Sequence, residues 1–379
     1  MKDGLPVPTK NLWVFTGNRA EYGLLYPLLV GLHAHVNFEV TLLIGGEHLH
    51  NAESFAETQE LQGIQPFILS LPKGTSHQVS SQISSHQIAM THAFEALSTP
   101  DAVLVLGDRM EAMGIALATF SQGVPLVHLA AGDLTQGGCV DDRLRFAISS
   151  LATYAVCFSE ESQARLLQQG LLEASHVLKS PSLAVDNALN VTAISRDAFC
   201  HDVGLNPQTP FLLFTQHPVG GEGKTSVDYF NASLEALASL EDVQVLATYP
   251  NQDAHGDDFL AVIEQSQQTR SQIHWVKHLG AERYQQALHH CVGVVGNSSS
   301  GLYETAFYQK PCLNIGNRQA GRERASNVLD CDYGVEAVSQ GLQTLLYDVD
   351  FHQQAKGAVS PFGSEASVPT IVAFLGELL

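Results

Sequence analysis

The chain has 379 residues, which is too long for one ordinary hydrophobic core and fits two domains of typical size. Hydrophobic residues make up 45% and charged residues 15%, a composition that excludes a disordered chain. The 19 basic and 39 acidic residues give a formal net charge of −20, and such a surface repels nucleic acids and anionic membranes. We therefore expect neither as a partner, whereas local arginines and backbone dipoles still allow a small anionic ligand.

The cellular location follows from the N-terminus and the cysteines. Two prolines precede a short apolar run at the N-terminus, which argues against a signal peptide, and no apolar run reaches the roughly 20 residues of a membrane span. The six cysteines form no CxxC pair, and several lie in apolar runs, as buried free thiols do in a reducing compartment. These features predict a cytoplasmic protein.

The first half of the chain alternates short apolar runs with longer segments of helical period. The pattern predicts strands at residues 12–16, 39–44, 102–106, 125–129, 155–158 and 176–179. It predicts helices at residues 22–33, 53–62, 86–96, 110–120, 143–151 and 161–168, with a polar loop at 75–87. Fully apolar strands that alternate with helices indicate a parallel sheet with right-handed crossovers.

A proline follows the last of these strands, and we interpret residues 180–190 as a hinge. A second series then predicts strands at 211–215, 243–248, 273–276, 293–295 and 312–315, and helices at 228–238, 259–265, 283–290 and 302–308. The predicted fold class is α/β, with two Rossmann-like domains, residues 1–180 and 181–365, facing across a cleft. An apolar helix within residues 366–379 is expected to pack back across the domain boundary. Ligands of open α/β sheets bind at the carboxyl ends of the strands.

Two charged motifs follow strands of the first domain. Arg19 lies in TGNRAEYG, where free backbone N–H groups and a guanidinium suit a phosphate, although such glycine turns also occur for structural reasons alone. Asp108 and Arg109 lie in GDRME after the strand at 102–106. Asp108 either caps the next helix or takes part in catalysis, because catalytic groups collect at strand ends.

Three further carboxylates lie within ten residues: Asp133 on a glycine-rich loop, and Asp141 and Asp142 at the start of the next helix. Their mutual repulsion should raise the pKa of at least one of them, unless arginines or a ligand compensate. A carboxyl group with a raised pKa suits general acid–base catalysis. The alternative for Asp141 and Asp142 is a solvated helix N-terminus, where the helix dipole favours aspartate.

The second domain carries motifs suited to a nucleotide. His217, in TQHP, follows the first strand of this domain, and we favour a ligand contact for it. The most specific motif is GNSSSGLYE at residues 296–304, where serine hydroxyls and backbone N–H groups can hold a pyrophosphate without a metal. Glu304, one turn further, is placed to accept hydrogen bonds from ribose hydroxyls. Arg318 and Arg322 follow the next strand.

Together these motifs resemble the UDP-N-acetylglucosamine 2-epimerase family, and they occur in family order from residue 16 to about residue 322. The hydrolysing branch, which feeds sialic- and legionaminic-type sugar pathways, matches better than the branch that keeps UDP on its product. The resemblance implies a GT-B-like fold in which the second domain chiefly holds the nucleotide. It also implies a homodimer or a homotetramer.

The resemblance assigns roles to individual residues. The groups implied for UDP and the sugar are Arg19, Arg109, His217, Asn251, His278, Ser298, Ser299, Ser300, Glu304, Arg318 and Arg322. Of these, Asn251 matches a position near the sugar, and His278 lies in the segment that borders uracil. The positions linked to catalysis are Asp108, Asp133, Asp141 and Asp142, with Arg145 beside them. The chain departs from many members at Ala130, Leu106 and Phe146, and a phenylalanine cannot transfer a proton.

The expected reaction is an elimination across C1 and C2 of a UDP-linked N-acetylated amino sugar, followed by addition of water. The products would be UDP and a free 2-epimer of the N-acetylmannosamine type. The substrate is UDP-N-acetylglucosamine or a 2,4-diacetamido relative. We expect no cofactor and no metal, because the sequence has no GxGxxG fingerprint and no HExxH motif. The alternatives are a GT-B glycosyltransferase that uses a UDP-sugar, and a UDP-sugar-binding protein with reduced catalysis.

Overall fold

The computed structural model describes residues 9–50, 63–64, 66–72, 78–135, 141–219, 223–250 and 256–379. The chain divides into two compact units, which we describe separately. Unit 1 is drawn from Met1–Leu134, Val140–Asp186 and Glu365–Leu379, and unit 2 from Thr135–Cys139 and Asn187–Ser364. The chain passes from unit 1 to unit 2 within α7 (Leu183–Asn190), so the segment interpreted as a hinge contains a helix.

Unit 1 is built on a seven-stranded sheet with the order β3-β2-β1-β4-β5-β6-β7, and every neighbouring pair is parallel. The strands are β1 (Lys10–Thr16), β2 (Phe38–Ile44), β3 (Pro66–Ile68), β4 (Ala102–Leu106), β5 (Leu126–Leu129), β6 (Tyr154–Cys157) and β7 (Val177–Lys179). The chain runs outward from β1 to β3 and returns to β4, so the strand order reverses between β1 and β4. Open α/β sheets bind ligands at such a reversal.

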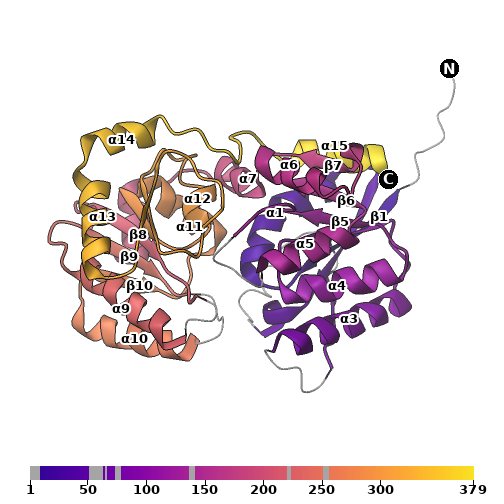
Figure 1. Ribbon diagram of the computed structural model, residues 1–379, viewed down its shortest axis with the longest axis horizontal. Helices are drawn as coiled ribbons and strands as arrows, with labels where there is room; N and C mark the ends of the chain where they lie inside the picture. The colour runs from indigo at the N-terminus through magenta and orange to yellow at the C-terminus, as the bar shows by residue number, and fades with distance from the viewer. Residues whose placement is uncertain are drawn as a thin grey trace. The chain divides into compact units, whose positions relative to one another are not determined.

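Helices α3, α4 and α5 pack on one face of this sheet around Trp13, Met90 and Ile115, whereas α1 packs on β1, β2 and α15 (Figure 1). The helices of unit 1 are α1 (Arg19–Ala34), α3 (Val79–Ala96), α4 (Met110–Ser121), α5 (Asp141–Leu151), α6 (Glu160–Gln168) and α15 (Val368–Leu378), with short 3-10 helices at Gly46–His50 and Ala174–His176.

The loop expected at residues 75–87 is wrong from Val79 onward, where α3 begins. Its serines and glutamines conceal the helix, but Ala89, Met90 and Ala93 recur at helical spacing and are buried. The polar residues before them lie mainly on the outer side of the same helix. The helix expected at 53–62 lies outside the described residues.

Unit 2 is built on a six-stranded parallel sheet with the order β10-β9-β8-β11-β12-β13. The strands are β8 (Phe211–Thr215), β9 (Gln244–Thr248), β10 (Ile273–Val276), β11 (Gly293–Gly296), β12 (Cys312–Ile315) and β13 (Val328–Cys331). The strand order reverses between β8 and β11, as it does between β1 and β4 in unit 1. Two Rossmann-like units of this kind confirm the predicted α/β, GT-B-like fold class.

The helices of unit 2 are α8 (Arg196–Val203), α9 (Gly223–Ala238), α10 (Gly256–Thr269), α11 (Gly280–His290), α12 (Ser300–Tyr303), α13 (Val335–Tyr347) and α14 (Val349–Lys356). The helix expected at 302–308 is therefore shorter than predicted. After Tyr303 the chain continues in turns to Gln309, which has a φ of 54° and ends the segment before Pro311.

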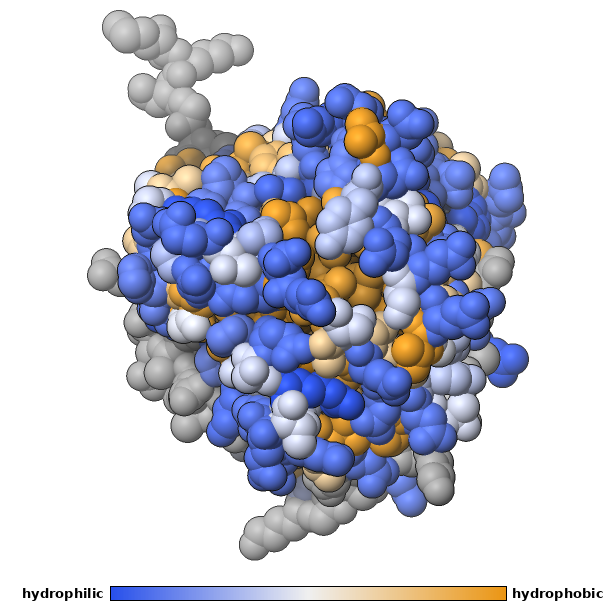
Figure 2. Space-filling model, turned by 90° about the vertical axis from the view of Figure 1, so that its left-hand side faces the viewer, coloured by the Kyte–Doolittle hydropathy of each residue, from blue (hydrophilic) through white to orange (hydrophobic). Residues whose placement is uncertain are grey.

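The face shown in Figure 2 is mainly hydrophilic, with smaller hydrophobic areas between the polar side chains. Exposed apolar residues of unit 2 include Val349 and Val359. Scattered exposure of this kind is normal for globular proteins. No helix in the described part of the chain combines the length and the hydrophobicity that a transmembrane span requires.

A buried carboxylate fixes the return of the C-terminal helix to unit 1. Asp186 is 3% exposed and accepts hydrogen bonds from the backbone N–H of Ser367 at 3.0 Å and of Val368 at 3.3 Å. The Ser367 hydroxyl donates to the same carboxylate. Val368 then packs closely on Gly31 of α1, where a side chain larger than hydrogen would clash. The start of α15 is thus held by both polar and apolar contacts.

We expect Asp186→Ala to lower the free energy of unfolding by about 2–3 kcal/mol, because it leaves buried N–H and O–H donors without an acceptor. Urea denaturation measures this change. As a control, Asp350→Ala at an exposed position of α14 should change the value by less than about 0.5 kcal/mol. An unchanged stability of Asp186→Ala would show that apolar packing alone holds α15.

Candidate active site

The first candidate site lies where β1, β4 and β5 end in unit 1. β4 and β5 each run into a loop with residues of positive φ, namely Gly107 at 77° after β4, and Ala130 at 60° and Gly132 at 78° after β5. Glycine adopts this conformation readily, but an alanine with positive φ is strained. Strained backbone clusters at functional sites, so Ala130 marks the end of β5 as a place of interest.

Arg145 of α5 gathers the acidic residues at this edge. Its guanidinium is only 3% exposed, forms an ion pair with Asp108, and lies 3.2 Å from an Oδ1 of Asp142. It also donates a hydrogen bond of 3.0 Å to the backbone carbonyl of Asp133. The structure therefore brings four of the five predicted catalytic residues together, and the arginine offsets the repulsion between the carboxylates. Asp141, in the first turn of α5, is exposed.

The side chain of Asp133 has a different partner from its backbone. The Ser162 hydroxyl donates to Asp133 Oδ1 at 2.8 Å, and the carboxylate is 4% exposed. His128, in β5, joins the neighbouring loop through a 2.7 Å contact between its Nε2 and the Gly107 carbonyl oxygen. Burial lowers the pKa of His128 to about 4, so the neutral ring donates through Nε2 and accepts from the Ser149 hydroxyl through Nδ1. His128 thus positions the loop that carries Asp108.

Arg109 turns toward buried carboxylates. Its Nε and Nη2 lie 3.3 Å from the two oxygens of Glu111, which is 3% exposed, and Nη2 lies 3.9 Å from Glu47. Glu21 belongs to the same cluster and accepts the Gly17 N–H at 2.8 Å. Burial raises the pKa of Glu21 to about 7, with Arg109 opposing the rise and Glu111 adding to it.

Glu21 and Glu111 are not among the residues predicted from the sequence, although the sequence contains a signal for them. Both glutamates end a Gly-x-Arg-x-Glu segment that follows a strand, at residues 17–21 and 107–111. In both segments the glutamate lies in the first turn of the following helix. Arg19, half-buried at the start of α1, occupies the place in the first segment that Arg109 has in the second.

The second candidate site lies where β8 and β11 end in unit 2, and Asn297 is its centre. The His217 N–H donates to Asn297 Oδ1 at 2.7 Å, and Asn297 Nδ2 donates to the His217 carbonyl at 2.9 Å. The preceding Gly296 lies so close to the Thr215 carbonyl that no other residue fits there. These contacts hold the loops after β8 and β11 together. Burial and the nearby Arg318 lower the pKa of His217 to about 3, so its ring is neutral.

The loop after β12, which carries Arg318 and Arg322 and is called the arginine loop below, also contacts Asn297. Arg318 Nη1 and Gln319 Nε2 both donate to the Asn297 carbonyl, at 3.1 and 2.9 Å. Arg322 donates to Gln319 Oε1 at 2.7 Å, and its guanidinium lies 5.3 Å from the centre of the Tyr303 ring. Arg318 and Arg322 are thus held beside the serine loop (Ser298–Ser300).

The serine loop and Glu304 complete this set. Ser300 contacts the hydroxyl of Tyr284 and donates to Ser298 Oγ at 3.2 Å, and Ser299 precedes α12 as its N-cap residue. Glu304 is 8% exposed and accepts from Gln285 Nε2 at 2.6 Å. Burial raises the pKa of Glu304 to about 7, against the hydrogen bond from Gln285.

One predicted residue of unit 2 lies apart from this set. His278 is exposed and follows β10, at the edge of the sheet two strands away from β8. Asn251 lies outside the described residues.

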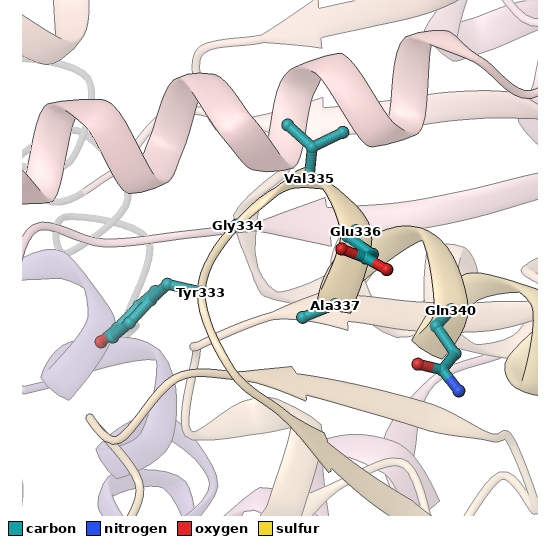
Figure 3. A pocket seen from close by; sticks show the side chains of 6 residues that line it. All are labelled: Tyr333, Gly334, Val335, Glu336, Ala337 and Gln340. Atoms are coloured by element: carbon teal, nitrogen blue, oxygen red, sulfur yellow. The ribbon is translucent and has the colours of Figure 1, made fainter.

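A shallow hollow of about 380 Å³ opens at the start of α13 (Figure 3). Figure 3 shows the Tyr333 side chain pointing away from those of Glu336 and Gln340. The Tyr333 hydroxyl donates to Asn317 Oδ1 at 3.0 Å, so the hollow adjoins the arginine loop. None of the predicted site residues lines it; its lining consists of Tyr333, Gly334, Val335, Glu336, Ala337 and Gln340.

The two units with parallel sheets define a GT-B-like fold. The chain belongs to the UDP-N-acetylglucosamine 2-epimerase family, whose model matches residues 31–376. This result confirms the resemblance found in the motifs.

Curated relatives and solved structures agree with this membership. The chain is 31% identical to a Legionella pneumophila UDP-N,N'-diacetylbacillosamine 2-epimerase (hydrolyzing), over 87% of each chain. It is 28% identical to a Campylobacter jejuni GDP/UDP-N,N'-diacetylbacillosamine 2-epimerase (hydrolyzing), over 85% of this chain and 84% of the relative. The Neisseria meningitidis UDP-GlcNAc 2-epimerase bound to UDP-GlcNAc has the same fold, with a TM-score of 0.83, 17% identity, and coverage of 97% of this chain and all of that one.

The buried Glu21 gives stability a dependence on pH. The folded protein binds the Glu21 proton more tightly than the unfolded chain does, because the pKa is about 7 in the folded protein and 4.5 otherwise. The contribution of Glu21 to the free energy of unfolding is therefore complete below about pH 4.5 and is lost as the pH rises through about 7. Glu21→Gln keeps an acceptor for the Gly17 N–H, so its gain in stability over the wild type should be about 2–3 kcal/mol larger at pH 8 than at pH 5.

Urea denaturation of both proteins at pH 5 and pH 8 measures this difference. Glu161→Gln on α6, where the side chain is 66% exposed, should show the pH dependence of the wild type. Equal pH dependence of Glu21→Gln and the wild type would contradict the raised pKa of Glu21.

Proposed function

We propose that the chain is a hydrolysing 2-epimerase that converts a UDP-linked 2-acetamido sugar to UDP and the free 2-epimer. The single observation that carries the proposal is the pairing of Asp108 and Asp142 with the buried Arg145 at the end of β4 and the start of α5. Family membership supports it, and so do the names of the Legionella and Campylobacter relatives.

In this proposal the diphosphate and the nucleoside are bound by unit 2. The hydroxyls of the serine loop (Ser298–Ser300) and the guanidinium groups of Arg318 and Arg322 would donate to the diphosphate. Glu304, in its ionised form, would accept hydrogen bonds from the ribose hydroxyls, and the neutral His217 would complete the contact with the nucleotide. His278 and Asn251 keep the roles that the family resemblance implies, beside uracil and the sugar.

The residues of unit 1 are proposed to handle the protons. A carboxylate, Asp108, Asp133, Asp141 or Asp142, removes the proton at C2, and its C–H electrons form the C1=C2 double bond while UDP leaves with the C1–O electrons. Water then adds its hydroxyl to C1, and a proton returns to C2 on the opposite face. The net reaction consumes one water and yields UDP and the free sugar. Arg19 and Arg109 would face the sugar or the diphosphate, and Arg145 would orient the carboxylates.

Several finer features belong to the same proposal. A 2,4-diacetamido sugar is the favoured substrate, because two relatives carry that substrate class in their names. The product would then enter a sialic- or legionaminic-type pathway in the cytoplasm. Resemblance to the family supports a homodimer or a homotetramer. The glycosyltransferase alternative has less support, since it gives no reason for carboxylates gathered around a buried arginine.

Incubation in deuterated water tests the reaction itself. We expect a free sugar with deuterium at C2, because the proton taken by the carboxylate is replaced from solvent before or during its return. The test uses UDP-N-acetylglucosamine and a UDP-linked 2,4-diacetamido sugar as substrates and mass spectrometry for detection. A product that is unlabelled at C2 or still attached to UDP would reject the hydrolysing elimination. Transfer that depends on an added acceptor would favour the glycosyltransferase.

Replacement of Asp108 or Asp142 by asparagine keeps the shape of the side chain but removes its basicity. We expect turnover to fall by about 100-fold or more if the residue is the general base, with little change in UDP affinity. Asp197→Asn, at an exposed position of α8, serves as the matched control and should keep normal turnover. Near-normal turnover in Asp108→Asn, Asp133→Asn and Asp142→Asn alike would show that these carboxylates only cap and brace the loops.

A further inference from the structure

Helix α11 contributes two neighbouring polar side chains that the proposed reaction does not use. Gln285 is 3% exposed, and Tyr284 is largely buried beside it. Burying an amide and a phenol is unfavourable unless they form hydrogen bonds, and apolar side chains would fill the same space at lower cost. Both side chains contact residues of the nucleotide site in unit 2, which suggests why polar groups occupy these positions.

Tyr284 begins a chain of three hydroxyl groups. Its hydroxyl contacts Ser300 Oγ, and Ser300 in turn donates to Ser298 Oγ at 3.2 Å. Either hydroxyl could donate in the first contact, and the arrangement in which Ser300 donates to Ser298 makes the phenol the donor. Burial raises the pKa of Tyr284, so the phenol remains protonated throughout the neutral range. In this series of hydrogen bonds the Ser298 hydroxyl accepts from Ser300, so its own proton can be donated to a ligand, such as a phosphate oxygen.

Gln285 is the middle of a second chain, which ends on an acceptor. The Tyr308 hydroxyl donates to Gln285 Oε1 at 2.9 Å, and Gln285 Nε2 donates to Glu304 Oε1 at 2.6 Å. The phenol fixes the orientation of the amide, because a phenol donates to the amide oxygen and not to the NH₂ group. The Glu304 carboxylate is thereby held with one oxygen bound and the other available to a ligand.

We propose that Tyr284 and Gln285 are positioning residues of the nucleotide site, which present Ser298 as a donor to the diphosphate and Glu304 as an acceptor to the uridine. This inference rests on the proposed binding of UDP by unit 2. It assigns the two chains to different parts of one ligand. Removal of either chain should therefore weaken the binding of a different fragment of UDP, which a general loss of packing would not do.

The second chain also predicts how binding depends on pH. The titratable groups that face Glu304 are Tyr284 on α11 and Tyr308 in the turn after α12, and both remain neutral because burial raises their pKa values. Burial raises the pKa of Glu304 to about 7, and the hydrogen bond from Gln285 opposes this rise. Ribose hydroxyls donate best to the ionised carboxylate, so uridine affinity should increase as the pH rises through about 7. Loss of Gln285 should move this midpoint upward.

The experiment measures binding of uridine and of UDP between pH 6 and pH 8.5, by calorimetry for UDP and by ligand-observed NMR for uridine. Tyr284→Phe should weaken UDP binding about tenfold and change uridine binding by less than about twofold. Gln285→Met, which keeps the length of the side chain, should weaken binding of both ligands about fivefold and raise the pH midpoint for uridine. Tyr347→Phe and Gln353→Met, at exposed positions, are the matched controls and should behave as the wild type does.

Tyr308→Phe provides a second route if the buried variants fold poorly, because it removes only the hydroxyl that orients Gln285. It should raise the uridine midpoint in the same direction as Gln285→Met, by a smaller amount. Circular dichroism verifies the fold of each variant.

The outcomes separate this inference from the proposed function. If the wild type binds UDP and Glu304→Ala weakens it, UDP binding by unit 2 stands. The positioning role would then be rejected, without the proposed function, by either of two results. In the first, Tyr284→Phe and Gln285→Met weaken the binding of UDP and of uridine by the same factors. In the second, both variants have the affinities and pH midpoints of the controls. A wild type that does not bind UDP would reject both the proposed function and this inference.

Discussion

The buried guanidinium of Arg145 is the interaction on which the first site depends. It joins the loop after β4, the loop after β5 and the first turn of α5 through Asp108, the Asp133 carbonyl and Asp142. A buried charge is tolerable only when it is paired, and removal of one partner from a buried pair typically costs about 3–5 kcal/mol. The same pairing allows carboxylates to gather at one strand end, where they would otherwise repel one another. Stability and the proposed chemistry therefore depend on the same contacts.

Asn297 has the equivalent position in unit 2, although it is uncharged. The side chain of Asn297 both donates to and accepts from the backbone of His217. The backbone carbonyl of Asn297 accepts hydrogen bonds from Arg318 and Gln319. A neutral residue at this position suits the proposed binding of a diphosphate, because a carboxylate there would compete with the phosphate for the arginines. Asn297 thus holds the loops on both sides of the reversal between β8 and β11, whereas Arg145 joins the loops after β4 and β5 on one side of the reversal in unit 1.

The sequence predicted the strands and the strand-end motifs better than the residues that support them. The bounds of β4, β8 and β12 match the expectation because these strands are apolar throughout and buried on both faces. β13 was missed, since an edge strand with a half-exposed pattern lacks that signal. Tyr284 and Gln285 lie on helix α11, and no motif indicates which loop a helix side chain contacts until the fold is known.

Glu21 and Glu304 are buried acids whose ionisation lowers the stability of the folded protein. Each carboxyl group is buried at a strand end, and burial raises the pKa of each to about 7. Near neutral pH each group therefore lies between its two protonation states, which is unfavourable for stability and favourable for a group that must gain or lose a proton or accept a ligand hydroxyl. Neither glutamate forms an ion pair as close as that of Asp108 with Arg145. Burial is thus the main cause of the raised pKa of these two glutamates, whereas Asp108 and Asp142 are paired with Arg145.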